Sequence, residues 1–250
     1  MLILALDTSS SKGSIAILSG EEVLGHCQTD SSKTYSSQLF RPLDLLLNEL
    51  SLGPDKFDLY AVAAGPGSFT GLRVGLAAVK AWAEVYRKPI AGISCLEAVA
   101  TQSASAAPYV VPIFDARRGQ VYAAVYKRSD SVEGPGGDRE KDGSAALVLE
   151  GEERVCTADE FLSTLPGIVK GAAFSIITPE PELLAEALSR VNGSHPYPRD
   201  RQVERSSNFL APFIGKLAYQ RALRGELTDS LGLDAHYIRR PDAELNWKRK

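Results

Sequence analysis

Two aspartates, Asp7 and Asp115, each follow an apolar run and precede a polar turn that contains glycine. A carboxylate in this position can organise a magnesium–phosphate group, while the N–H and hydroxyl groups of a turn such as Thr8-Ser9 hold phosphate oxygens. The simpler alternative is that each carboxylate caps its own turn by accepting backbone hydrogen bonds. Two interpretations therefore stay open, a phosphate-binding cleft and a pair of capped turns.

The segment at 65–71 reads Gly-Pro-Gly-Ser-Phe-Thr-Gly and looks like a phosphate loop. It lacks the dinucleotide fingerprint because Thr70 stands where a glycine is needed, and it lacks the P-loop pattern because Leu72-Arg73 follows Gly71. What remains is a tight turn and a helix N-terminus with Ser68 or Thr70 as the N-cap. Such a terminus can bind an anion, but most helix ends do not.

Other chemistry-bearing residue types form no catalytic pattern. The three histidines are scattered and give no His-x-x-x-His pair, which argues against a histidine-ligated metal. There is no Gly-x-Ser-x-Gly elbow and no Cys/His pairing that would indicate a nucleophile. The three cysteines stand far apart, which excludes a disulfide scaffold and favours a reducing compartment.

The runs that carry these residues predict an α/β fold. Apolar runs at 2–6, 14–18 and 23–29 predict an antiparallel three-stranded meander. Leucines at helical spacing predict a helix over 36–50, bent near Pro42. A strand at 59–64, a long helix after the glycine loop and a short strand at 90–93 follow, and helical patterns return at 182–190 and 207–225.

An approximate repeat relates the two aspartate-ending strands. The strand at 110–115 resembles the one at 2–7, and a second apolar strand at 121–126 follows Gly119 as another follows Gly13. A long-period repeat of this kind predicts two related α/β domains. We place them at 1–105 and 106–250, with the option that the last helix and tail cross back to the first domain. The alternative is that strand-turn-strand beginnings are simply common.

The helix after the glycine loop contains Gly71 and Gly75, four residues apart. Glycine inside a helix costs about 0.5–1 kcal/mol relative to alanine, so a close backbone approach should compensate. That approach could come from the helix at 36–50 or from another subunit, and the excess of apolar faces favours a subunit interface. The candidate interface residues are Leu39, Leu43, Leu46, Leu47, Gly71, Leu72, Gly75, Ala78, Val79 and Trp82.

Charge and hydropathy exclude two classes of protein. The formal net charge of −3 argues against autonomous nucleic-acid binding, although the basic tail at 248–250 could contact RNA if it is not merely solvated. No run approaches the 18 apolar residues of a membrane span, and we expect a cytoplasmic protein. An acidic segment at 129–145 is expected to form a loop, to which we assign no role.

Four segments resemble the bacterial TsaB (YeaZ) family, whose members take part in tRNA threonylcarbamoyladenosine synthesis. They occur in family order at Asp7–Ser9, Gly65–Gly75, Asp115–Tyr122 and Tyr237–Arg239. The resemblance implies two actin-like/Hsp70-like (ASKHA, ribonuclease H-like) domains with mixed sheets flanked by helices. In the family, the two N-domain helices, about 36–50 and 70–86 here, form the dimer interface.

The resemblance also implies a non-catalytic subunit that binds and activates the catalytic paralogue TsaD, together with the ATPase TsaE. TsaD carries the metal-binding His-x-x-x-His, which this chain lacks. Many TsaB proteins keep a histidine followed by a hydroxyl residue around the equivalent first helix, but here that segment is Thr34 to Gln38, so this remnant is absent too. We expect a homodimer when TsaD is absent, tRNA contact only through the complex, and no membrane contact. No metal or cofactor is expected, except ADP or ATP at the complex interface.

Whether a vestigial nucleotide cleft still binds nucleotide is left open. It would comprise Asp7, Thr8, Ser9, Gly65, Gly67, Ser68, Asp115 and Arg118. The competing interpretation is an enzyme of the same fold, either a nucleotide-dependent small-molecule kinase or a peptidase. The glycine loop lacks lysine and no general base is identifiable, which disfavours that interpretation.

Overall fold

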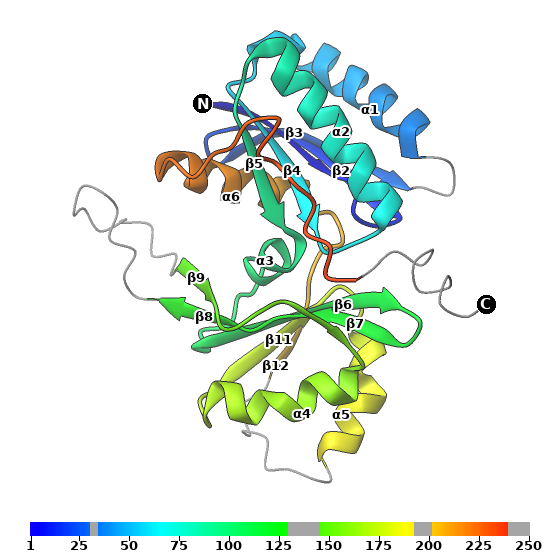
Figure 1. Ribbon diagram of the computed structural model, residues 1–250, viewed down its shortest axis with the longest axis vertical. Helices are drawn as coiled ribbons and strands as arrows, with labels where there is room; N and C mark the ends of the chain where they lie inside the picture. The colour runs from blue at the N-terminus through cyan, green and yellow to red at the C-terminus, as the bar shows by residue number, and fades with distance from the viewer. Residues whose placement is uncertain (31–34, 130–145, 193–201, 240–250) are drawn as a thin grey trace. The chain divides into compact units, whose positions relative to one another are not determined.

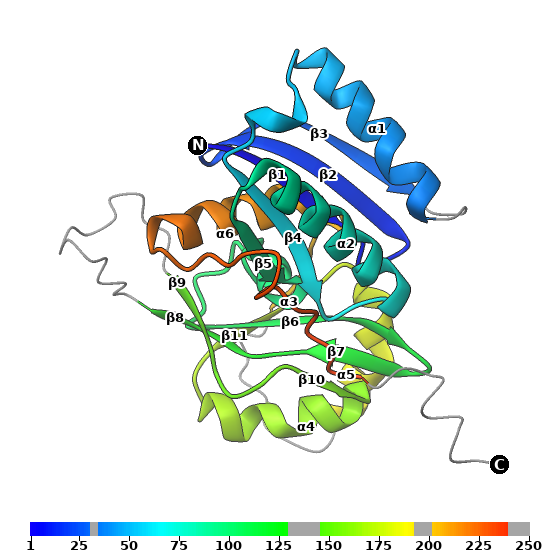
Figure 2. The same cartoon turned by 45° about the horizontal axis from the view of Figure 1, so that its top comes forward.

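A computed structural model describes residues 1–30, 35–129, 146–192 and 202–239. The acidic loop and the basic tail predicted above fall largely on 130–145 and 240–250, which lie outside the described residues, as do Thr34 and the side chains of 35–38. The chain divides into two compact units, the first comprising 1–98 with 208–250 and the second 99–207. Figure 1 labels most of the helices and strands of both units, and Figure 2 labels β1 and β10.

Unit 1 is built on a five-stranded sheet in the order β3-β2-β1-β4-β5. The strands are β1 (Leu2–Asp7), β2 (Lys12–Ser19), β3 (Glu22–Asp30), β4 (Leu59–Gly65) and β5 (Ile90–Ser94). The first three are antiparallel neighbours, and β4 and β5 continue the sheet in parallel with β1. The predicted meander and the following α/β segment are therefore confirmed.

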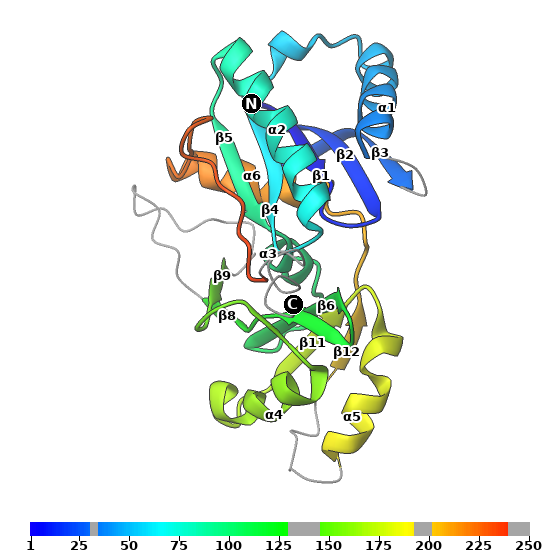
Figure 3. The same cartoon turned by 45° about the vertical axis from the view of Figure 1, so that its right-hand side comes forward.

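Helices cover both faces of this sheet. They are α1 (Tyr35–Glu49), α2 (Phe69–Tyr86) and α6 (Ala211–Leu223), with a 3-10 turn at Pro54–Lys56 and the short α3 (Cys95–Ala100) after β5. Figures 1 and 3 show α1 and α2 side by side on one face, with α6 on the other, where it contacts β1, β2, β4 and β5. The first unit thus takes its last helix from the far end of the sequence.

Unit 2 repeats the strand order of unit 1. Its sheet runs β10-β7-β6-β11-β12, with the hairpin of β8 and β9 attached to β6. The strands are β6 (Tyr109–Arg117), β7 (Gln120–Ala123), β8 (Tyr126–Ser129), β9 (Ala146–Leu149), β10 (Arg154–Cys156), β11 (Phe174–Thr178) and β12 (Gln202–Arg205). The central strand is β6. As in unit 1, the two strands on one side of the central strand are antiparallel to their neighbours, and the two strands on its other side run parallel to it.

This correspondence confirms the predicted fold class, an α/β protein with two actin-like mixed sheets flanked by helices. The strand predicted over 121–126 needs correction, because β7 ends at Ala123 and a separate strand begins at Tyr126. The apolar run is continuous in sequence but belongs to two strands. β7 pairs with the C-terminal half of β6, whereas β8 pairs with the start of β6 and forms a hairpin with β9.

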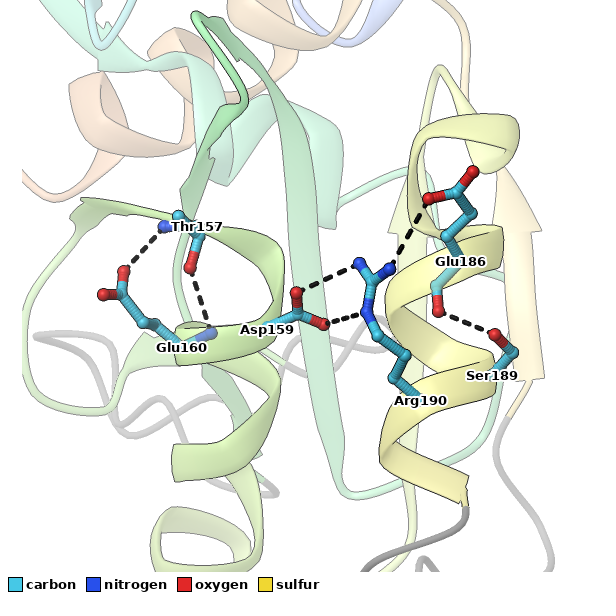
Figure 4. Close-up of polar contacts among 6 residues, drawn as sticks. All are labelled: Thr157, Asp159, Glu160, Glu186, Ser189 and Arg190. Atoms are coloured by element: carbon cyan, nitrogen blue, oxygen red, sulfur yellow. Dashed lines mark hydrogen bonds and ion pairs between the residues drawn. The ribbon is translucent and has the colours of Figure 1, made fainter.

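The helices of unit 2 are α4 (Ala158–Val169) and α5 (Ala185–Asn192), the latter preceded by a 3-10 turn at Pro181–Leu184. A capping box begins α4: the Thr157 hydroxyl accepts from the Glu160 N–H, and the Glu160 carboxylate accepts from the Thr157 N–H (Figure 4). Arg190 of α5 binds both carboxylate oxygens of Asp159, at 3.0 and 3.2 Å. Figure 2 shows α4 and α5 in a view tilted so that the top of Figure 1 comes forward.

No helix in the described part of the chain is long and apolar enough to cross a membrane.

Candidate functional site

The turn after β1 is closed by its own hydrogen bonds. Asp7 is 1% exposed, and its Oδ1 accepts from the Ser9 N–H at 2.9 Å and from the Ser9 hydroxyl at 2.6 Å. The Thr8 hydroxyl donates to the Gly71 carbonyl at 2.7 Å. Both hydroxyls that could hold a phosphate oxygen are therefore already engaged within unit 1.

The second oxygen of Asp7, Oδ2, is buried without a hydrogen-bond partner among the described residues. Burial raises the pKa of this carboxyl, while the hydrogen bonds from Ser9 and the nearby backbone N–H of Leu210 act in the opposite direction. Leu210 immediately precedes α6, so Asp7 lies close to the N-terminus of that helix. The positive end of the helix dipole partly compensates the buried carboxylate.

The glycine loop packs directly onto this turn. The Ser68 N–H donates to the Ser9 carbonyl at 2.6 Å, and the Ser68 side chain caps α2 by accepting from the Gly71 N–H. A Cβ atom at Gly71 would overlap the Thr8 carbonyl, and one at Gly75 would overlap the Thr8 hydroxyl. The close approach that these glycines permit is therefore made by the β1–β2 turn, and neither by the helix at 36–50 nor by another subunit.

The C-terminal motif lies beside the same loop. The His236 N–H donates to the Ala64 carbonyl at 2.7 Å. The Tyr237 ring lies 4.8 Å from the Phe69 ring, and the Arg73 side chain covers Phe69 and approaches the Tyr237 hydroxyl at 3.3 Å. Three of the four segments that carry the family resemblance thus pack together in unit 1.

Asp115 belongs to unit 2 and is exposed. Its Oδ1 accepts from the Arg117 N–H at 2.7 Å, and its own N–H approaches Glu180 at 3.3 Å. Arg117, Arg118 and Gly119 all have positive φ angles, 63°, 57° and 71°, which form the tight turn into β7. Each of the two predicted aspartates thus caps its own turn.

Most of the predicted interface residues are buried within unit 1. Of the ten residues, Ala78 and Trp82 are partly exposed. The other eight are buried: Leu39, Leu43, Leu46 and Leu47 in α1, and Gly71, Leu72, Gly75 and Val79 in α2. These eight attach the two helices to their own sheet, and a partner protein could reach only the outer side chains.

Sequence reasoning missed two exposed apolar side chains on these helices. Phe40 of α1 is 50% exposed and Val85 of α2 is 71% exposed. Phe40 meets Trp82 edge-to-face at 6.3 Å, and Val85 follows Trp82 by three residues, which places it on the same side of α2. We call Phe40, Ala78, Trp82 and Val85 the α1–α2 patch.

An aromatic chain holds this patch in place. The Trp82 ring lies 5.9 Å from Tyr60, and Tyr60 lies 6.1 Å from Phe57, both of which are fully buried. Aromatic contacts of this kind contribute about 0.5–1.5 kcal/mol each beyond their buried area. The Phe40–Trp82 pair therefore lies at the outer end of the core, and its contacts within unit 1 hold it in position without a bound partner.

Among the described residues, no group of three or more His, Cys, Asp and Glu side chains is placed to hold a metal ion.

Comparisons with known proteins agree with this fold. A family model for TsaD, tRNA N6-adenosine threonylcarbamoyltransferase, matches residues 25–139. The TsaB protein of Bacillus subtilis is 38% identical over 53% of this chain and 58% of its own length, and that of Haemophilus influenzae is 35% identical over 49% and 52%. The chain therefore spans about half the length of the curated relatives it matches.

The solved structure of YeaZ from Pseudomonas aeruginosa has the same fold. It superimposes with a TM-score of 0.68 over 95% of this chain and all of the YeaZ chain, at 22% sequence identity. By sequence over half of its length and by fold over nearly all of it, this chain is confirmed to resemble the TsaB (YeaZ) family.

Proposed function

We propose that the protein is a non-catalytic subunit of the complex that forms threonylcarbamoyladenosine in tRNA. It binds and activates a TsaD-family transferase through the α1–α2 patch, together with the ATPase TsaE, and contacts tRNA only as part of that complex. The names of its relatives support the pathway. The observation that carries the proposed role is the exposed patch itself.

The patch has the properties of a protein-binding surface. Apolar side chains as exposed as Phe40 and Val85 are costly in water when they cluster, and such clusters on soluble proteins mark interaction sites. Aromatic residues held rigidly lose little conformational entropy on binding, which is why Trp and Phe are enriched at interfaces. In the absence of TsaD, two copies of this chain would cover the patch by pairing with each other.

The Asp7 turn supports a role without independent catalysis. Its two hydroxyls and one carboxylate oxygen are engaged within unit 1, and its residues are buried. We therefore propose no cofactor for the isolated chain. A nucleotide, ADP or ATP, would be held at the interface with the partner. The subunit would act in the cytoplasm, where the tRNA is.

Reconstitution of tRNA modification tests this proposal. TsaD-family transferase, TsaE, ATP, the threonylcarbamoyl adenylate donor and tRNA are combined with the native chain, with Phe40→Asp, or with Asp7→Asn. We expect modification to require the chain, to be lost with Phe40→Asp, and to persist with Asp7→Asn. Modification that proceeds equally without the chain would refute the proposed role. Loss of modification in an assembled complex containing Asp7→Asn would contradict its non-catalytic character.

A further inference from the structure

A turn at residues 229–232 of unit 1 presents the most exposed large apolar side chain in the described part of the protein. Leu231 is 90% exposed. A single exposed leucine is common on protein surfaces and needs no explanation by itself. Leu231 is of interest because hydrogen bonds and packing contacts hold the turn that carries it in one conformation.

The turn is closed by the Asp229 carboxylate. Its Oδ1 accepts hydrogen bonds from the Leu231 N–H at 3.0 Å and from the Gly232 N–H at 2.7 Å. The Asp229 carbonyl accepts from the Leu233 N–H at 3.1 Å. These two N–H bonds to the carboxylate hold the pKa of Asp229 below its ordinary value, so the carboxylate keeps the turn closed at neutral pH.

Both ends of the turn are attached to β5. Before it, Thr228 exchanges two backbone hydrogen bonds with Ile90, at 2.8 and 2.9 Å. After it, the buried Leu233 side chain fills the space above Gly92, where an added Cβ would come within 2.7 Å of Leu233. The chain on either side of Leu231 is therefore held against β5, by a backbone bridge at Thr228 and by side-chain packing at Leu233.

A side-chain contact places the turn beside α2. The Ser230 hydroxyl donates to the Glu84 carboxylate at 2.6 Å. Glu84 is adjacent to Val85 of the α1–α2 patch, so the turn stands at the C-terminal end of the helix that carries most of the patch. Phe40 of α1 contacts Trp82 of α2, and Ser230, the neighbour of Leu231, contacts Glu84 of the same helix.

We propose that Leu231 is an anchor residue for the partner subunit, with its side chain entering an apolar pocket on the protein that binds the α1–α2 patch. This inference rests on the proposed function and adds a second attachment point to it. A turn already fixed in its bound shape loses little entropy on association, and full burial of an exposed leucine is strongly favourable.

The test measures the dissociation constant of the complex between the full chain and the TsaD-family transferase. Five chains are compared: native, Leu231→Asp, Leu231→Ala, Val85→Arg and the control Leu183→Asp, which places aspartate at an exposed leucine of unit 2. We expect Leu231→Asp to raise the dissociation constant about 100-fold and Leu231→Ala about tenfold, with Leu183→Asp unchanged. Equal melting temperatures verify that the variants are folded.

The outcomes separate the two claims. Native affinity in Leu231→Asp together with lost binding in Val85→Arg overturns the anchor and keeps the patch. Lost binding in Leu231→Asp with native affinity in Val85→Arg supports the anchor and contradicts the patch. If sedimentation shows that Leu231→Asp weakens only self-association of this chain, the anchor serves a second copy and the inference as stated is overturned.

Discussion

The hydroxyl of Ser14 in β2 accepts a hydrogen bond of 3.0 Å from the backbone N–H of Ala211, the first residue of α6. The two residues are 197 positions apart in the sequence. The residue that precedes α6, Leu210, has no side chain that could cap the helix, so the cap comes from the sheet. A residue at the start of the chain thereby fixes a helix near its end within the same unit.

Replacement of Ser14 by alanine should destabilise unit 1 by about 1–2 kcal/mol, because it leaves a buried helix N–H without an acceptor. The control is Ser163→Ala in α4, whose exposed hydroxyl donates to the Glu160 carbonyl within its own helix. That change should stay within about 0.5 kcal/mol. Urea unfolding measures both, and equal effects would contradict the capping role.

Alanine at Gly71 should destabilise the protein by about 1–3 kcal/mol, because its Cβ would overlap the Thr8 carbonyl, which is backbone and cannot move aside. Gly167 of α4 is the matched control, since it is exposed and nothing lies within 4 Å of an added Cβ. Gly167→Ala should stabilise by about 0.5–1 kcal/mol. Melting temperatures that change in the same direction would refute the close packing of α2 on the turn.

Asp7 should make the stability of the native chain fall as pH rises. Burial raises its pKa in the folded state above the unfolded value of about 3.9. The folded protein therefore retains this proton longer than the unfolded chain, and stability decreases between that value and the folded pKa. Asp7→Asn does not titrate. We expect its melting temperature, relative to the native chain, to increase from pH 4 to pH 8; a constant difference would contradict the raised pKa.

Glu204 in β12 should have the opposite pH dependence. Burial raises its pKa, but hydrogen bonds from the Ser103 and Ser175 hydroxyls and the Ala104 and Ser105 backbone N–H groups outweigh this and lower it overall. Its folded pKa lies below the unfolded value of about 4.3, so its contribution is present above that value and is lost as pH falls through the folded pKa.

Glu204→Gln should therefore cost about 1 kcal/mol at pH 7, a modest value because the carboxylate is partly exposed to water. The difference from the native chain should shrink as the pH falls toward 3, because protonation of the native carboxylate removes the charge that accepts these hydrogen bonds. Glu186→Gln, which weakens only an exposed contact with Arg190 at 3.5 Å, is the control and should have little effect at either pH. A cost that stays unchanged at pH 3 would contradict the role of the charge.

Long apolar runs were enough to predict the first sheet and the repeat. The runs at 2–6 and 110–115 became the central strands β1 and β6 because such residues are buried from both sides. The strands β9, β10 and β12 have only three or four residues, too few for a period to emerge. The start of α4 was readable in principle, since Thr157 and Glu160 form a capping-box pattern.

The candidate surface was harder to predict than the fold. The spacing of Gly71 and Gly75 indicated a close backbone approach, but a sequence pattern does not identify its origin, and the contact comes from Thr8 more than sixty residues earlier. Leu39 and Phe40 are apolar neighbours in one run, yet only Leu39 is buried. Which apolar residues remain outside depends on how α1 lies against β3 and α2, which is decided by tertiary packing.

The central claim is that the α1–α2 patch binds the TsaD-family partner, and the mass of the mixture tests it most directly. Native mass spectrometry compares equimolar mixtures of the partner with the native chain, Val85→Arg and the control Leu223→Arg, which places arginine at the exposed C-terminal end of α6. The account predicts a complex with the native chain and with Leu223→Arg, and separate subunits with Val85→Arg. A Val85→Arg complex as abundant as the native one would contradict it.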